Sequence, residues 1–346
     1  MLKNLIILLF VFLVGAGGFI FLKQNRGISI PSMLEENLGG PTEEKNTHPL
    51  QITQMRRVEY PGSEIVIEQE LSSGSNYQRY IASYKSEGLK IYGLLTTPLG
   101  NAPQGGWPAI IFNHGYIAPE VYKTTEKYVA YQDGFARVGY VTFKSDYRGH
   151  GNSEGKPEGA YYSTAYTTDV LNAVASIKML KYVNPKKIGM WGHSMGGHIT
   201  LRSMVVSKDI KAGVIWGGVV GSYQEMAENW RRARTWRPST RETQSFRPTR
   251  QGLIDKYGDW NANPDFWNSI SPIKFVSEIS GPVQLHHAID DESVPWEFSQ
   301  SLKNALDEAG KEVDYFTYEN SDHNLSGSAF GLAMNRSLEF FNRYLK

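Results

Sequence analysis

Hydrophobic residues along most of the chain fall into short runs that alternate with longer, helix-like segments. Six apolar runs follow one another from residue 109 onward. The runs cover 109–113, 140–144, 188–191, 212–216, 283–286 and 313–318. Helix-like segments at 161–180, 198–206 and 297–309 lie between them, and another at 330–344 follows the last run. This alternation is typical of a parallel sheet with helices on both of its faces.

Three further β-like stretches precede these runs, at 64–71, 77–86 and 89–96. The last two are separated by Glu87-Gly88, a signal for a tight turn, which predicts an antiparallel meander. The whole pattern therefore predicts an α/β fold with a mostly parallel sheet of about eight strands and an antiparallel N-terminal meander. The stretch from about 222 to 280 is too long for a simple crossover, so we predict a helical cap insertion there.

The first 62 residues follow a different pattern. Leu5–Leu22 is uncharged and as a helix would be about 27 Å long, close to the roughly 30 Å of a bilayer's hydrocarbon layer. We expect residues 1–23 to form a transmembrane anchor, with a cleaved secretory signal as the alternative. Residues 24–62 are polar and irregular, which predicts a flexible tether. We therefore expect a folded domain at 63–346 that lies outside the cytoplasm, either anchored in the membrane or secreted.

Composition removes several classes of function. The net charge of the 346 residues is +1, which gives no indication of nucleic acid binding. The chain has no cysteine, which excludes disulfides and thiolate chemistry. It contains no glycine-rich nucleotide motif, and no third ligand stands at a suitable spacing beside His193 and His198. We therefore expect no cofactor and no metal, while the oligomeric state stays open.

The strongest chemical signal is a serine enclosed by glycines, in the segment Gly192-His193-Ser194-Met195-Gly196. The segment joins an apolar run to a helix-like stretch, and a serine on such a strand-to-helix turn is typical of a hydrolase nucleophile. Glycines at both ends leave room for the strained turn that lifts the serine hydroxyl above the sheet. The backbone N–H of Met195, at the start of the helix, is placed to stabilise an oxyanion.

A serine nucleophile needs a histidine base, and the base needs a carboxylate that orients it. In sheets with this serine turn the acid comes before the base in the chain. His286 and His287 lie at the end of a strand, ahead of the acidic stretch. The predicted base is therefore His323, in the loop between the last strand and the final helix.

The acid is expected directly after the run at 283–286, where Asp290, Asp291 and Glu292 are available. Here the sequence resembles the α/β-hydrolase superfamily, within it the serine hydrolases like dienelactone hydrolase and prolyl oligopeptidase. Residues 287–295 (HAIDDESVP) are similar to the pattern H-G-x-x-D-x-x-V-P of that branch. The resemblance implies Asp291 as the acid, with Asp290 as the alternative.

A second match lies at the end of an earlier predicted strand. Residues 112–116 (FNHGY) resemble the H-G-x motif that supplies the second oxyanion donor in this branch. The resemblance implies that the backbone N–H of Tyr116 is this donor. The H-G-Y form is similar in particular to relatives of acetyl xylan esterase.

The resemblance implies a serine hydrolase that cleaves short-acyl or acetyl carboxylic esters through Ser194, His323, Asp291 and an acyl-enzyme. A serine peptidase of aminopeptidase or oligopeptidase type is the alternative. We favour an ester because about 60 residues precede the domain, whereas the large oligopeptidases carry a propeller domain there. A second alternative is a non-catalytic binding module on the same fold, although such modules usually lack a triad member.

The predicted insertion is rich in arginine and tryptophan, with seven arginines and one acid between Arg231 and Arg250. These arginines either pair with carboxylates and face water, or form a lid that receives an anionic substrate or rests on anionic lipid headgroups.

Overall fold

The computed structural model describes residues 47–230 and 240–346. The predicted membrane segment at 1–23 and most of the predicted tether lie outside these ranges. Within the ranges, no helix has the length and apolar character that crossing a bilayer requires.

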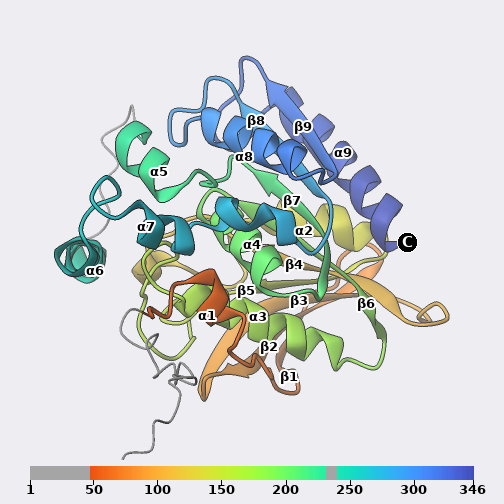
Figure 1. Cartoon of the computed structure of the whole chain (residues 1–346). Helices are drawn as coiled ribbons and strands as arrows, with labels where there is room; N and C mark the ends of the chain where they lie inside the picture. Colours follow the sequence, from red (N-terminus) through yellow and green to blue (C-terminus); the bar gives the residue numbers. More distant parts are fainter. Residues whose placement is uncertain (1–46, 231–239) are drawn as a thin grey trace, which may run out of the picture. The chain divides into compact units, whose positions relative to one another are not determined.

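One sheet organises the described residues, with the strand order β1-β2-β3-β5-β4-β6-β7-β8-β9 (Figure 1). Its strands are β1 (Val66–Leu71), β2 (Tyr77–Ser86), β3 (Leu89–Pro98), β4 (Trp107–Asn113), β5 (Val141–Ser145), β6 (Val183–His193), β7 (Ile210–Trp216), β8 (Val283–Ala288) and β9 (Val313–Tyr318). Strands β1, β2, β3 and β5 pair antiparallel in that order, whereas the neighbours from β5 to β9 are parallel. The predicted fold is confirmed, with nine strands in place of about eight.

Burial along the strands follows their place in the sheet. Six of the seven residues of β4 and all five of β5 are buried, because helices cover both faces of the parallel part. By contrast, five of the six residues of β1 are exposed. This strand forms one edge of the sheet, and the charged side chains of Glu68 and Glu70 are suited to an edge that must not pair with another chain.

Helices pack on the two faces of the sheet and enclose separate clusters of apolar side chains. The first cluster lies against α1 (Ile52–Met55), α3 (Ala165–Lys178), α4 (Met195–Val206) and α8 (Glu297–Glu308). The second is rich in aromatic rings and lies against α2 (Val129–Arg137) and α9 (Ser328–Leu345). The 3-10 turn η2 (Pro119–Val121) lies in the loop after β4. The two-sided core fixes the sheet, and with it the loops at the carboxyl ends of its strands.

Residues 47–62, which the sequence assigned to a flexible tether, are packed on the domain. Leu50, Ile52 and Met55 are buried, and the Arg56 guanidinium donates to the carbonyl of Val205 at 2.9 Å. A few apolar side chains in a mostly polar segment are enough to dock it, and a prediction based on polarity misses them.

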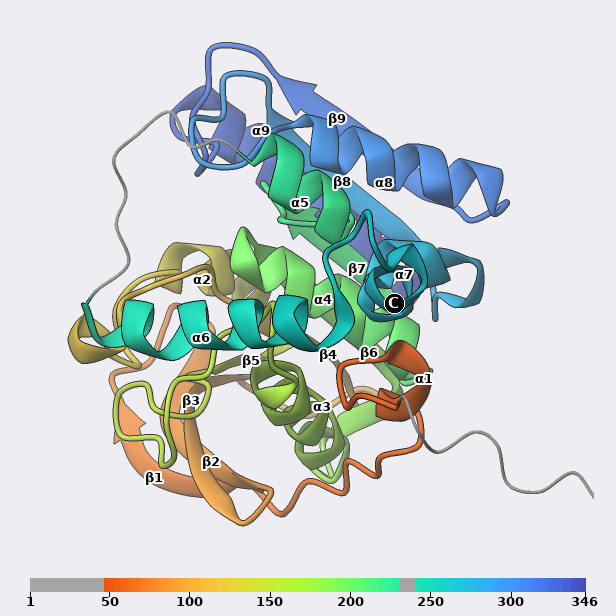
Figure 2. The ribbon, with the colours of Figure 1, turned by 60° about the vertical axis from the view of Figure 1, so that its left-hand side comes forward.

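The described part of the predicted insertion contains three helices and a short 3-10 helix: α5 (Tyr223–Asn229), α6 (Thr240–Tyr257), α7 (Pro264–Ile270) and η3 (Pro272–Glu278). Ser222 and Glu225 form a capping box that begins α5, and Asn263 caps α7. Side chains of α5, α6 and α7 form a third apolar cluster together with Leu50. Figure 2 shows α6 along its length. Residues 231–239, with four of the seven arginines, lie outside the described ranges.

Candidate active site

Ser194 occupies a sharp turn between β6 and α4. Its φ of 56° and ψ of −119° are rare for a residue with a side chain and cost about 1–3 kcal/mol. Three backbone hydrogen bonds hold this conformation. The Ser194 N–H donates to Trp216 O at 3.0 Å, and its carbonyl accepts from Gly197 at 2.9 Å and from Val219 at 3.1 Å. The strained serine is thus fixed by backbone groups of β7, of α4 and of the loop after β7.

The two glycines of the motif are required by space. A Cβ on Gly192 would lie 2.3 Å from the carbonyl oxygen of Gly196. A Cβ on Gly196 would lie 1.9 Å from the carbonyl oxygen of Asn113, on the neighbouring strand β4. The turn can therefore pack against β4 only when both positions lack a side chain, as the motif predicted.

The structure joins His323 to Asp291. His323 lies in the loop between β9 and α9, and Asp291 in the loop between β8 and α8. The Nδ1–H of His323 donates to Oδ2 of Asp291 at 2.7 Å. This hydrogen bond fixes the neutral imidazole in the tautomer that leaves Nε2 free to accept a proton.

Asp291 accepts three hydrogen bonds, from the N–H groups of Ser293 at 2.8 Å and Val294 at 2.9 Å on Oδ1, and from His323 on Oδ2. The Nε2–H of His287 donates to the carbonyl of Val294 at 3.1 Å and is shared with Oδ2 of Asp291 at 3.2 Å. Burial alone would raise the pKa of this carboxyl, but the hydrogen bonds from His287 and His323 bring the pKa well below its usual range. Asp291 is therefore ionised at neutral pH although its side chain is fully buried.

The alternative acid, Asp290, is exposed and turned to a different partner. Its Oδ2 accepts the backbone N–H of Asn320 at 3.0 Å. Of the two neighbouring aspartates, the structure places Asp291 against the histidine.

Ser194 and His323 line one cavity of about 340 Å³. Tyr116, Tyr161 and Trp230 form an aromatic part of its wall. The Trp230 indole N–H donates to Ser293 O at 2.8 Å, and its ring meets that of Tyr161 edge to face at 5.6 Å. Met195, whose N–H is a predicted oxyanion donor, is the first residue of α4, directly after the serine.

Comparison with known proteins identifies the family of the chain. Residues 128–346, more than half of the chain, match the prolyl oligopeptidase family. The chain belongs to the prolyl oligopeptidase family. The matched residues include the serine turn, Asp291 and His323, while Tyr116 lies ahead of them.

Several relatives of this protein are much longer than its 346 residues. An uncharacterized peptidase YuxL of Bacillus subtilis is 26% identical over 254 residues, which are 69% of this chain and 34% of the relative. Human dipeptidyl peptidase 8 is 24% identical over 71% of this chain and 26% of its own. The chain spans between 26% and 36% of the length of the curated relatives it matches.

Solved structures share the fold. An acetyl xylan esterase from Paenibacillus sp. R4 superposes with a TM-score of 0.63 at 16% identity, over 85% of this chain and 92% of that one. An acylaminoacyl peptidase from Pyrococcus horikoshii gives a TM-score of 0.62 at 22% identity, over 79% of this chain and 42% of that one. At these identities the likenesses show a shared fold.

Three residues that the sequence analysis did not assign to the site lie against it. His287 is a second histidine on Asp291, and its Nδ1 accepts from the hydroxyl of Ser299 at 2.7 Å. Tyr128 and His193 are joined by a hydrogen bond of 2.7 Å beside Ser194. His193 stands inside the serine motif, but nothing in its local sequence indicates that it contacts a tyrosine 65 positions away.

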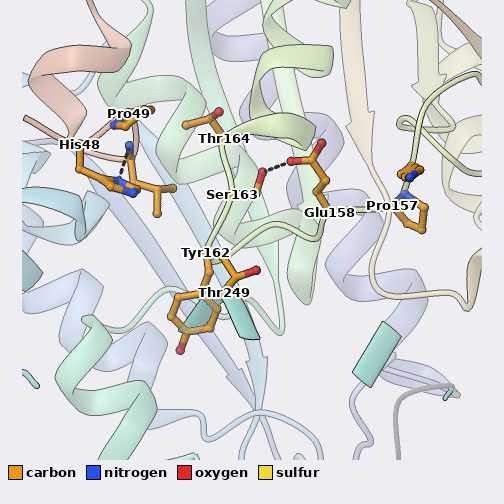
Figure 3. Close-up of a pocket in the computed structure, with 10 residues that line it drawn as sticks. His48, Pro49, Pro157, Glu158, Tyr162, Ser163, Thr164 and Thr249 are labelled. Carbon is orange, nitrogen blue, oxygen red and sulfur yellow. Dashed lines mark hydrogen bonds between the residues drawn. The ribbon is translucent and has the colours of Figure 1, made fainter. Parts of the chain in front are cut away.

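A different pocket, of about 370 Å³, is drawn in Figure 3. It is formed by residues 48–50 of the docked N-terminal segment, the loop at 156–164 and Thr249 of α6. Figure 3 shows the hydroxyl of Ser163 bonded to the carboxylate of Glu158, at 2.8 Å. The pocket contains neither Ser194 nor His323, so it is separate from the candidate site. Over the parts of the chain that are described, no three acidic or histidine side chains are grouped to hold a metal ion.

Proposed function

We propose that the protein is a serine hydrolase that cleaves carboxylic esters of short acyl or acetyl groups. One observation carries the proposal: His323 is bonded to a buried Asp291 at 2.7 Å and lines one cavity with the strained Ser194. A nucleophile, an acid and a base in this order along the chain, at the carboxyl ends of β6, β8 and β9, suit acyl transfer.

In the proposed reaction, Ser194 Oγ attacks the ester carbonyl while His323 Nε2 takes the hydroxyl proton. The carbon–oxygen bond to the alcohol then breaks, and the imidazolium returns the proton to the leaving oxygen. Water, activated by the same imidazole, attacks the acyl-enzyme and releases the carboxylic acid and free Ser194. Asp291 stays ionised throughout and stabilises the imidazolium. The N–H groups of Met195 and Tyr116 stabilise the oxyanion, each by about 3 kcal/mol.

The size of the cavity supports a small acyl group. About 340 Å³ lies at the low end of small-molecule sites, which extend from roughly 300 to 1,000 Å³. The acetyl xylan esterase fold matches this chain over 92% of its own length, which supports an ester as substrate.

A serine peptidase is the second candidate. It is favoured by the family match and by relatives whose names describe peptidases. The same triad would attack an amide, with His323 protonating a leaving amine in place of an alcohol.

Two substrate series separate these candidates. We expect hydrolysis of p-nitrophenyl acetate and butyrate, with kcat/KM falling for longer acyl chains, and much slower release of p-nitroaniline from aminoacyl p-nitroanilides. The Ser194→Ala variant gives the background for each substrate. Turnover of the anilides that exceeds turnover of the esters would contradict the ester proposal and favour the peptidase. Turnover of neither series above the Ser194→Ala background would overturn both.

We also propose that Leu5–Leu22 anchors the protein in a membrane with the catalytic domain outside the cytoplasm. The support is its uncharged length, which suits a bilayer. Fractionation with N-terminal sequencing tests it: we expect an intact N-terminus in the membrane fraction, with the domain accessible to added protease on the outer side. Recovery of a shortened chain in the medium would instead favour a cleaved signal.

A further inference from the structure

His193 lies next to the nucleophile and is bonded on both sides of its ring. Its Nε2 is 2.9 Å from the backbone carbonyl of His323, and its Nδ1 is 2.7 Å from the hydroxyl of Tyr128. A carbonyl only accepts, so Nε2 carries the proton and Nδ1 accepts from the tyrosine. Burial, helped by the nearby His323, lowers the pKa of His193 to about 3, so the ring stays in this neutral form.

The Tyr128 hydroxyl has a second partner in the loop after β4. It accepts the backbone N–H of Gly115 at 2.9 Å, directly before Tyr116. A Cβ on Gly115 would lie 2.6 Å from this hydroxyl oxygen and 3.1 Å from the Cβ of Ser194. The tyrosine therefore approaches the loop closely, beside the nucleophile.

The backbone that carries Tyr128 is itself fixed. Lys127 and Tyr128 have φ values of 47° and 58°, in the left-handed region that bulky residues rarely adopt. The buried Lys144 ammonium donates to the carbonyls of Glu126 at 2.9 Å and Lys127 at 3.0 Å. A left-handed turn held by a buried cation gives Tyr128 a defined place.

The bonds form a continuous series from the Gly115 N–H through the Tyr128 hydroxyl and the His193 ring to the His323 carbonyl. The series joins the loop of the second oxyanion donor, the serine turn and the loop of the base. We propose that Tyr128 and His193 are positioning residues. They act as a unit that holds Tyr116 and His323 in their positions relative to Ser194. This inference rests on the proposed serine hydrolase function but goes beyond its triad.

The test is the rate at which a fluorophosphonate probe phosphonylates Ser194 in four variants. These are Tyr128→Phe, His193→Leu, the double variant and His193→Gln. Phosphonylation needs the base and the oxyanion donors but no particular substrate. Tyr140→Phe is a matched control, because it removes a hydroxyl that bonds Asn342 at 2.9 Å away from the cavity.

We expect Tyr128→Phe and His193→Leu each to slow the maximal rate of phosphonylation by up to about a hundredfold. The probe concentration at half-maximal rate should stay unchanged. The double variant should be no slower than the slower single variant, because both remove the same series of bonds. His193→Gln should recover most of the rate, since its amide supplies one acceptor and one donor. Tyr140→Phe should react like the wild type.

Three results would overturn the inference. They are a His193→Leu variant that reacts at the wild-type rate, a double variant whose loss is the product of the single losses, and a His193→Gln variant as slow as His193→Leu. A wild-type protein that reacts with the probe but hydrolyses no ester would instead contradict only the ester proposal.

Discussion

The loops at the carboxyl ends of the strands and the insertion between β7 and β8 are built in different ways. At the strand ends, buried polar groups are bonded to one another across the sheet, and Asp291 alone accepts three hydrogen bonds and contacts the ring of His287. The insertion is held mainly by apolar packing, in a cluster that it shares with Leu50, and its residue Trp230 contributes an aromatic wall to the cavity.

This difference separates two tasks. Chemistry requires groups held within a fraction of an ångström, which the bonded strand ends supply. Substrate selection requires surface of a suitable shape, which an insertion can supply and can change without disturbing the sheet. Changes at the strand ends should therefore alter kcat, and changes in the insertion should alter KM.

The largest expected effect is that of Ser194→Ala. Removing the nucleophile should lower kcat for p-nitrophenyl acetate by about 10⁶-fold, while the urea midpoint stays close to the wild-type value. The matched control is Ser207→Ala, at the other end of α4, which should keep full activity. Substantial activity in Ser194→Ala would show that the chemistry lies elsewhere.

Asp291→Asn should have the next largest effect. The amide retains the size of the side chain but can no longer stabilise an imidazolium, so kcat should fall by about 10⁴-fold. Asp290→Asn is a control one position away, and because Asp290 is exposed and bonded to Asn320 its activity should stay within a few-fold of wild type. The opposite pattern in the two variants would assign the acid to Asp290.

Trp230→Ala tests the role of the insertion. The loss of one aromatic wall should raise KM roughly tenfold, or about 1.4 kcal/mol, with a small change in kcat. Trp260 also lies in the insertion but outside the cavity, with its indole N–H on Glu228, so Trp260→Ala should leave KM unchanged. A Trp230→Ala variant that loses kcat at constant KM would contradict the separation of tasks.

The smallest expected effect per residue is on how the free energy of unfolding depends on pH. Burial lowers the pKa of six histidines, and five of them lie inside the fold, namely His114, His150, His193, His198 and His286. Each is protonated in the unfolded chain below about pH 6.5 but stays neutral in the fold, so stability is lost as the pH falls below that value. Each adds about 1.4 kcal/mol per pH unit to the slope. Burial raises the pKa of Asp146 to about 6, which offsets part of the loss.

The insertion contains no histidine, so acid should destabilise the sheet and its bonded loops. Urea unfolding at pH 7.5, 6.0 and 5.0 measures this slope. His198→Gln should reduce the slope by up to about 1.4 kcal/mol per pH unit, which is the contribution of one proton. A free energy of unfolding that does not change between pH 7.5 and 5.0 would contradict the account.

The sequence predicts the strands and the triad residues of the site better than the side-chain contacts between distant segments. The strands, the serine turn and the order of Ser194, Asp291 and His323 follow from apolar runs and spaced motifs, which are local signals. The choice of Asp291 over Asp290 depended on a family pattern. The contact of Tyr128 with His193, and the docking of residues 47–62, depend on packing between distant segments that no local pattern encodes.

Mass spectrometry after fluorophosphonate labelling tests the central claim most directly. We predict one covalent adduct, on the peptide that contains Ser194, formed in proportion to the loss of esterase activity, and almost none in His323→Ala. An unlabelled protein, or an adduct on another residue while Ser194 stays free, would contradict the claim and favour a non-catalytic binding module or a different nucleophile.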